Sequence, residues 1–144
     1  MSLDAARKIA VEALAQIENR TPAVFVLTSS RAGADCRAAA KTLADAFAAA
    51  AGSAAVGKTP IGGADAPLTA AAAEQAVAAL RKAQAVTVLP LPCLREDGDA
   101  MLLTAAAKHV LLLEQRGLSR TDEIDEALEL IRNLGARAVG FVLE

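Results

Sequence analysis

VFVLTSSRAGADCRAAAKTLADAF, residues 24–47, is the stretch that decides the fold of this chain. It begins with an apolar run at 24–27, which is typical of a buried strand. A short polar turn containing Gly33 follows, and an alanine-rich run from Arg37 places its larger apolar residues on one helical face. Phosphate-binding α/β proteins begin with a strand, a glycine-bearing turn and a helix, because N–H groups at the helix start attract anions. The stretch therefore predicts the frame of a nucleotide-binding site, but the residues that such a site needs in its turn are missing.

The composition excludes several kinds of partner. With 144 residues, the chain has the length of one compact domain, which we expect to span 1–144. Hydrophobic residues make up 54%, charged residues make up 22%, and the formal net charge is −2. This balance gives no electrostatic basis for binding nucleic acid, and the chain has no Tyr or Trp on which single strands could stack. We therefore expect no nucleic-acid partner.

The N-terminal region predicts a cytoplasmic protein. Asp4, Arg7, Lys8 and Glu12 interrupt any signal-peptide pattern. No apolar run approaches the roughly 18 to 20 residues of a membrane span, so we expect no direct membrane insertion. The opening Met-Ser-Leu and the final Glu144 are also compatible with a piece of a longer protein.

The order of the expected elements predicts the fold class. Helices are expected at 3–17, 37–51, 69–83, 98–108 and 121–134, and strands at 24–28, 86–89, 109–114 and 138–143, with at most a short edge strand near 54–56. Thr69 suits the N-cap of the third helix, while Ser119 and Thr121 compete as caps of the last. Such alternation gives a three-layer α/β/α domain around a mainly parallel sheet. Ligands of such sheets bind beyond the carboxyl ends of the strands, here 28–37, 90–99 and 114–119.

Few side chains suggest a metal or redox site. Cys36 and Cys93 are too few for a disulfide framework or a structural zinc site, so we expect idle thiols. A lowered pKa of Cys36 at its helix start is the alternative. Glu96, Asp97 and Asp99 favour a charged surface loop over a cation site.

A literal nucleotide motif lies elsewhere, where Gly52-Ser-Ala-Ala-Val-Gly57-Lys58-Thr59 fits G-x-x-x-x-G-K-T. In a working motif the lysine reaches the terminal phosphates and the threonine holds magnesium. The motif needs a strand before it and a helix after it, whereas here an alanine-rich helix precedes it and Pro60 follows it. We therefore predict an ordinary loop over 52–68, with ATP and magnesium at Gly57, Lys58 and Thr59 as the alternative.

The turn at 28–37 has the right context for a phosphate site. It resembles the P-loop of bacterial tyrosine kinases of capsule and exopolysaccharide assembly, a branch of the MinD-like P-loop ATPases. Their pattern is close to T-S-S-x-P-G-E-G-K-S-T, and the residues that match it are Thr28, Ser29, Ser30 and Gly33. The run at 86–94 is similar to the family's V-I-I-D-T-P-P-V segment, and 110–143 is similar to its closing strand, helix and strand. The resemblance covers most of the chain and implies a P-loop NTPase-like α/β fold.

The departures from the family pattern fall on its charged positions. Asp35 stands where the second glycine is expected, Cys36 where the lysine is, and Arg37 where the magnesium-binding Ser or Thr is. Pro90 occupies the position of the metal-organising aspartate, and 53–61 lacks the aspartates of the family's D-A-D-x-R segment. A carboxylate in a phosphate cradle repels the ligand. The resemblance therefore implies a degenerate P-loop with no cofactor.

The first helix carries part of a subunit-contact motif. The family has E-x-x-R-x-x-R there, and Asp4-x-x-Arg7-x-x-Ala10 is a partial match. Asp4 and Arg7 are therefore candidate partner-binding residues. A solvated ion pair on one helix face explains the same spacing.

The resemblance implies a pseudo-kinase, a non-catalytic cytoplasmic component of bacterial exopolysaccharide biosynthesis or polysaccharide export that acts by protein–protein association. Its expected partner is a membrane polysaccharide co-polymerase or a tyrosine kinase homologue, which would bring it to the inner membrane; self-association is expected to be weak. Because the chain has no Tyr, it cannot phosphorylate itself on tyrosine. The alternatives are an active ATP-binding kinase or ATPase that uses Lys58 and Thr59, and an unrelated partner-binding α/β module.

Overall fold

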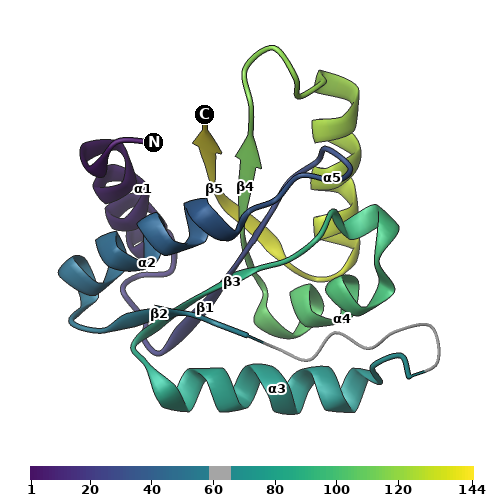
Figure 1. Cartoon of the computed structure of the whole chain (residues 1–144). Coiled ribbons are helices and arrows are strands. Elements are labelled where there is room, and N and C mark those ends of the chain that lie inside the picture. Colours follow the sequence, from purple (N-terminus) through teal and green to yellow (C-terminus); the bar gives the residue numbers. More distant parts are fainter. Residues whose placement is uncertain (59–65) are drawn as a thin grey trace.

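Strands and helices alternate along the computed structural model, which describes residues 1–58 and 66–144 (Figure 1). The helices are α1 (Leu3–Gln16), α2 (Arg37–Ala51), α3 (Ala70–Ala83), α4 (Gly98–Ala107) and α5 (Thr121–Asn133), with a short 3₁₀ helix η1 (Leu94–Glu96). The strands are β1 (Ala23–Thr28), β2 (Ala54–Val56), β3 (Val86–Pro90), β4 (His109–Glu114) and β5 (Arg137–Leu143). The helices and strands expected from the sequence are confirmed, and η1 is the addition.

The strands form one parallel sheet in the order β2-β3-β1-β4-β5. β1 lies at the centre, and all six of its residues are buried. Leu27 pairs with Pro90 of β3, and Thr28 pairs with Leu112 of β4. The carboxyl ends of β3, β1 and β4 therefore lie side by side along one edge of the sheet.

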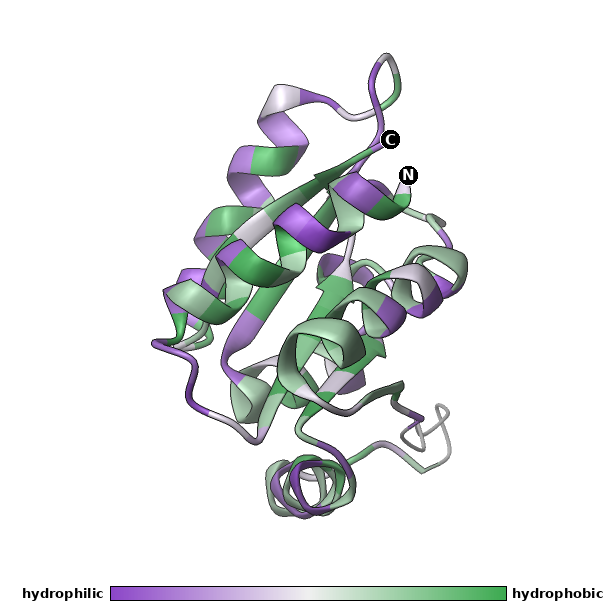
Figure 2. Cartoon of the chain, turned by 90° about the vertical axis from the view of Figure 1, so that its left-hand side faces the viewer, coloured by the Kyte–Doolittle hydropathy of each residue, from purple (hydrophilic) through white to green (hydrophobic). Residues whose placement is uncertain are grey.

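Helices cover both faces of the sheet. α1 and α2 pack on one face, where Phe25 of β1 stacks on Phe47 of α2 with ring centroids 4.9 Å apart. α3, α4 and α5 cover the other face around Val26 and Leu112. Figure 2 shows hydrophobic strands between helices whose outer surfaces carry the hydrophilic residues. The predicted three-layer α/β/α architecture with a parallel sheet is confirmed.

The ends of the helices partly follow the expected caps. The Thr69 hydroxyl accepts a hydrogen bond of 3.1 Å from the Ala72 N–H, as an N-cap does. For α5 neither expected cap is used: Arg120 is the N-cap residue and makes no capping side-chain bond. The hydroxyl of Ser119 instead accepts from the Gln115 N–H at 2.9 Å and so closes the β4–α5 turn.

Within residues 1–58 and 66–144, no helix combines the length and the apolar character that a membrane crossing requires.

Candidate functional site

A cavity of about 430 Å³ lies at the carboxyl edge of the sheet, between the β1–α2 turn and the segment after β3. Residues 33–37 line one side, and 90–93 with Glu96 line the other. This is the position where ligands of parallel α/β sheets bind. The structure thus brings together Gly33, Asp35, Cys36 and Arg37 of the predicted degenerate P-loop with Pro90.

The start of α2 is occupied by a carboxylate of the chain itself. Asp35 Oδ1 accepts a hydrogen bond of 3.0 Å from the Arg37 N–H, and the Arg37 guanidinium lies 2.8 Å from Asp35 Oδ2. The side-chain hydrogen bonds from Arg37, with its backbone bond, lower the pKa of Asp35 to about 2. An N–H group that would face an anion is therefore already taken by an ionised side chain.

Cys36 stands where the resemblance places the lysine, and it supplies no charge. Its side chain is buried. Burial, with the negative charges of Asp35 and Glu114, raises the pKa of the thiol to about 12. A lowered pKa was the alternative for this residue, and it is wrong because loss of water around the sulfur outweighs the effect of the helix start.

The serines at the end of β1 do not line the large cavity. Thr28, Ser29 and Ser30 are buried, and they fix the turn between its neighbouring strands. Thr28 Oγ1 donates to the Pro92 carbonyl at 2.9 Å, and the Ser29 hydroxyl accepts from the Arg31 N–H at 3.1 Å. Two of the matched residues, Ser29 and Ser30, therefore hold the turn rather than face the cavity.

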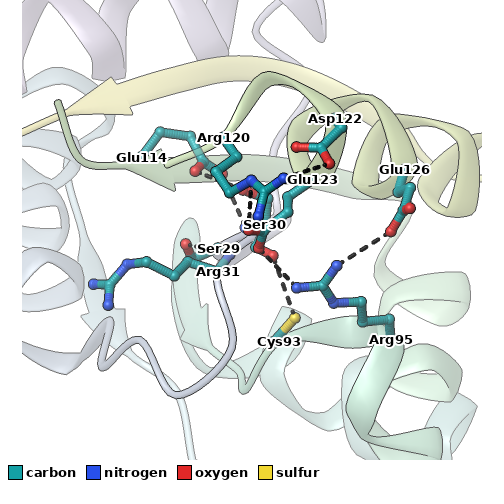
Figure 3. Close-up of polar contacts among 10 residues, drawn as sticks. All are labelled: Ser29, Ser30, Arg31, Cys93, Arg95, Glu114, Arg120, Asp122, Glu123 and Glu126. Carbon is teal, nitrogen blue, oxygen red and sulfur yellow. Dashed lines mark hydrogen bonds and ion pairs between the residues drawn. The ribbon is translucent and has the colours of Figure 1, made fainter. Parts of the chain in front are cut away.

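Glu114 is the residue that sequence reasoning missed. It closes β4 and is only 2% exposed, yet its carboxylate is bound from two sides by Ser30 (Figure 3). Oε1 accepts from the Ser30 N–H at 2.9 Å, and Oε2 accepts from the Ser30 hydroxyl at 2.7 Å. The only signal in the sequence was a glutamate directly after the apolar run 110–113, level with the predicted turn.

Charged side chains also link η1 to α5 beside the turn. Arg95 lies 2.8 Å from a carboxylate oxygen of Glu123 and 3.1 Å from one of Glu126 (Figure 3). Behind these pairs, a cavity of about 170 Å³ lies between the end of β1, η1 and α5, and Ser29, Ser30 and Cys93 are among its lining residues. The ion pairs connect the segment after β3 to the last helix.

Two acidic residues after β3 bind backbone N–H groups of the chain. Pro90, which stands where the resemblance expects an aspartate, ends β3 and has no metal-binding side chain. Asp97 caps α4 through the Ala100 N–H at 3.1 Å, and Asp99 accepts from the Leu68 N–H at 3.0 Å. Asp99 is 8% exposed, so the expected surface loop is wrong for this residue. Among the described residues, no three His, Cys, Asp or Glu side chains are grouped as a metal site.

The literal motif lies at the end of edge strand β2, which matches the short strand expected near 54–56. The Gly57 N–H donates to the Val88 carbonyl at 2.8 Å, so the sheet uses the donor that a phosphate would need. A Cβ at Gly57 would lie 2.6 Å from Thr87 Cγ2. Lys58 is exposed, and Thr59 lies outside the described residues.

The subunit-contact candidates lie on the outer face of α1. Asp4 and Arg7 are exposed, whereas Ala10 is completely buried against the core. Among the ion pairs of the described residues, none joins Asp4 to Arg7. Shallow hollows of about 370 and 280 Å³ flank these two residues, the second against Asp45 of α2.

Comparison with known proteins places this geometry in a fold group. No protein-family model and no curated protein matches the chain. The chimerical protein CapA2B2 aligns with a TM-score of 0.67 and 19% identity, over 94% of this chain and 82% of that one. The kinase domain of VpsO aligns with a TM-score of 0.66 and 17% identity, over 99% of this chain and 94% of that one.

A third solved structure, the kinase domain of the Escherichia coli tyrosine kinase ETK, aligns with a TM-score of 0.47 and 11% identity over 94% of this chain and 60% of that one. The first two alignments extend over nearly the whole chain and over most of each partner. Together with the five-stranded parallel sheet, they show that the chain shares the α/β fold of CapA2B2 and of the VpsO kinase domain.

Proposed function

We propose that the chain is a pseudo-kinase: a non-catalytic, cytoplasmic component of bacterial exopolysaccharide biosynthesis or export that acts by association with other proteins. The observation that carries this proposal is the Asp35 carboxylate at the start of α2, bound to the Arg37 N–H at 3.0 Å. The family resemblance of 28–37 and the shared fold support the polysaccharide setting.

Asp35 disfavours a phosphate in two ways. Its oxygen accepts an N–H that would otherwise bind the ligand, and its charge, held by a pKa of about 2, repels an anion at neutral pH. Arg37 is paired with Asp35 and Cys36 is neutral, so neither side chain supplies the free positive charge that a phosphate site needs. The cavity beside them therefore keeps the position of a nucleotide site without its attraction for phosphate.

The outer face of α1 is the proposed contact surface. Asp4 and Arg7 lie between two hollows. Leu3 and Val11 of the same helix are 76% and 49% exposed. Apolar side chains next to charges on one exposed helix face suit a protein partner. The partner that we propose is a membrane polysaccharide co-polymerase or an intact kinase homologue, through which the chain would reach the inner membrane.

Titration calorimetry with ATP tests the proposal. We predict no saturable heat at millimolar ATP, with or without Mg²⁺. The matched control is the triple variant Asp35→Gly, Cys36→Lys, Arg37→Ser, which restores the family residues at these three positions of the turn and is expected to bind ATP–Mg²⁺ at least tenfold more tightly. A dissociation constant in the micromolar range for the native chain would contradict the proposal.

A second candidate, an ATP-binding kinase or ATPase, is favoured by the position of Lys58. This exposed cation directly follows Gly57 at the end of β2, at the same edge of the sheet as the cavity. If the native chain binds ATP and Lys58→Ala abolishes the binding, this candidate replaces the pseudo-kinase.

A further inference from the structure

Glu114 and Ser30 meet because the sheet places them at the same level. Thr28 of β1 pairs with Leu112 of β4 in parallel register. Ser30 lies two residues after Thr28, and Glu114 lies two residues after Leu112, so these two residues lie side by side. Glu114 lies 84 positions from Ser30 in the sequence, and both residues are almost fully buried, at 2% and 1% exposure.

Ser30 binds the Glu114 carboxylate in the way that a protein turn binds an oxyanion. One carboxylate oxygen accepts a backbone N–H at 2.9 Å, and the other accepts a hydroxyl at 2.7 Å. A backbone amide and a side-chain hydroxyl that converge on two oxygens are the donors with which turns bind carboxylate and phosphate. Here the anion belongs to the chain itself.

Arg31 gives a second, independent sign that this turn is built around a negative charge. Its Nε is buried and has no hydrogen-bond partner within the described residues, although its Nη2 donates to Gln115 Oε1 at 3.2 Å. Arg31, Glu114 and Gln115 line a common polar cavity of about 60 Å³, whose lining also includes the acidic residues Asp35 and Glu144. That volume has room for more than one water molecule, so a small ion could extend into it once the glutamate side chain is gone.

We infer that the β1 turn forms an oxyanion site whose permanent occupant is the Glu114 carboxylate, and that the vacated site takes a free carboxylate such as formate. The Glu114 carboxylate thereby holds the turn in the conformation that binds an anion, without any external ligand. This goes beyond the pseudo-kinase proposal and does not depend on the identity of the partner.

Chemical rescue tests the inference. Glu114→Ala leaves two buried donors at Ser30 without an acceptor, and we expect its melting temperature to fall by roughly 5 °C or more. Added sodium formate should restore part of that loss in a saturable way, whereas sodium chloride at the same ionic strength should not. The native chain and Glu129→Ala, which removes an exposed glutamate of α5, should show no saturable response. The absence of a saturable formate effect in Glu114→Ala, or an equal effect in the two controls, would overturn the inference.

A second comparison covers the case in which Glu114→Ala fails to fold. Glu114→Gln keeps the size of the side chain and removes its charge. Ser30→Ala removes the hydroxyl donor. We expect Ser30→Ala to lower the melting temperature more in the native background than in Glu114→Gln, because a hydroxyl binds a charged acceptor more strongly than a neutral one. Equal losses in both backgrounds would contradict the inference. ATP binding by the native chain would refute the pseudo-kinase proposal without bearing on this result.

Discussion

Cys36 behaves in this structure as a small apolar side chain rather than as a reactive thiol. It is buried at the start of α2, next to the ionised Asp35 and within the field of Glu114. These surroundings raise its pKa to about 12 and keep the thiol protonated in the folded chain. A protonated thiol is neither a good nucleophile nor a metal ligand.

The raised pKa of Cys36 makes stability depend on alkaline pH. The unfolded thiol ionises near pH 9, so the contribution of Cys36 to folding is complete below about pH 9 and is lost as the pH rises toward about 12. We predict that the free energy of unfolding falls more steeply in this window for the native chain than for Cys36→Ala, by up to about 1.4 kcal/mol per pH unit. Urea denaturation followed by circular dichroism, at about pH 8 and about pH 10.5, measures the difference. Parallel pH dependences of the two proteins would refute it.

For single residues, the sequence shows which positions are unusual but not which atoms they contact. Asp35, Cys36 and Arg37 stand out because the resemblance assigns a role to each position, although it could not show that Asp35 accepts the Arg37 N–H. Glu114 could not be found, because its partner Ser30 lies 84 positions away and only the register of β1 on β4 joins them.

The end of β2 matches the sequence of a nucleotide-binding motif for a different structural reason. Gly57 is followed by Lys58 and Thr59 in the sequence, as in a nucleotide-binding motif. The structure instead explains the glycine by its close packing against β3. Its N–H belongs to the pairing with β3, and its missing Cβ leaves space for the methyl group of Thr87. The preceding helix and the following Pro60 argued against the motif in the sequence, but no local signal showed that Gly57 packs against Thr87.

We predict that Gly57→Ala destabilises the fold. The new Cβ would lie 2.6 Å from Thr87 Cγ2, and threonine in a strand has little rotamer freedom with which to move away. Overpacking of this kind typically costs about 1 to 3 kcal/mol. Gly98→Ala, at the start of α4, is the control, because a Cβ there meets no atom within 4 Å. Urea denaturation of both variants measures the difference in their stability. Equal denaturation midpoints would argue against the close contact between Gly57 and Thr87.

Helix α1 is the element to which we assign partner binding. Charge reversal by Arg7→Glu is expected to weaken capture of a polysaccharide co-polymerase or kinase homologue several-fold and to leave the fold intact. An exposed ion pair contributes at most about 1 kcal/mol, so abolition of binding is not expected.

The measurement is a quantitative pull-down with circular dichroism as a folding test. Lys82→Glu makes the same kind of charge reversal on α3, across the sheet from α1, and should not change recovery. Equal recovery of Arg7→Glu and the native chain would remove α1 from the proposed contact. No recovery of any of the proteins would favour a partner-binding module unrelated to polysaccharide.

At the scale of the whole molecule, we predict a monomer or a weak dimer in isolation. The third position of the subunit-contact motif is Ala10, which is completely buried, so this position contributes no arginine to a neighbouring copy. Sedimentation velocity at micromolar concentration should give one species with the mass of a single chain, 14.7 kDa. A stable dimer or ring at that concentration would contradict this expectation.

The arrangement of the layers was predictable because it depends on pattern rather than on particular contacts. Fully apolar runs such as 24–27 and 110–113 indicate strands buried on both faces, and the helical runs between them require parallel crossovers. The cap of α5 was not predictable in the same way. Ser119 suits two hydrogen-bonding roles in its own neighbourhood, and the turn takes it before the helix can.

The carboxylates of Asp35 and Glu114, which bind N–H groups of their own chain, also have a consequence for how the protein responds to the energy state of a cell. A nucleotide-binding protein gains stability from its ligand, by about 2.7 kcal/mol when ATP is at a hundred times its dissociation constant, and loses that gain when ATP is depleted. In this chain Asp35 and Glu114 supply from within the acceptors that a ligand would bring. Under the pseudo-kinase proposal, its folded population does not depend on ATP supply. An assembly built on such a chain would persist in starved and growing cells alike, whereas assemblies of nucleotide-dependent proteins would not.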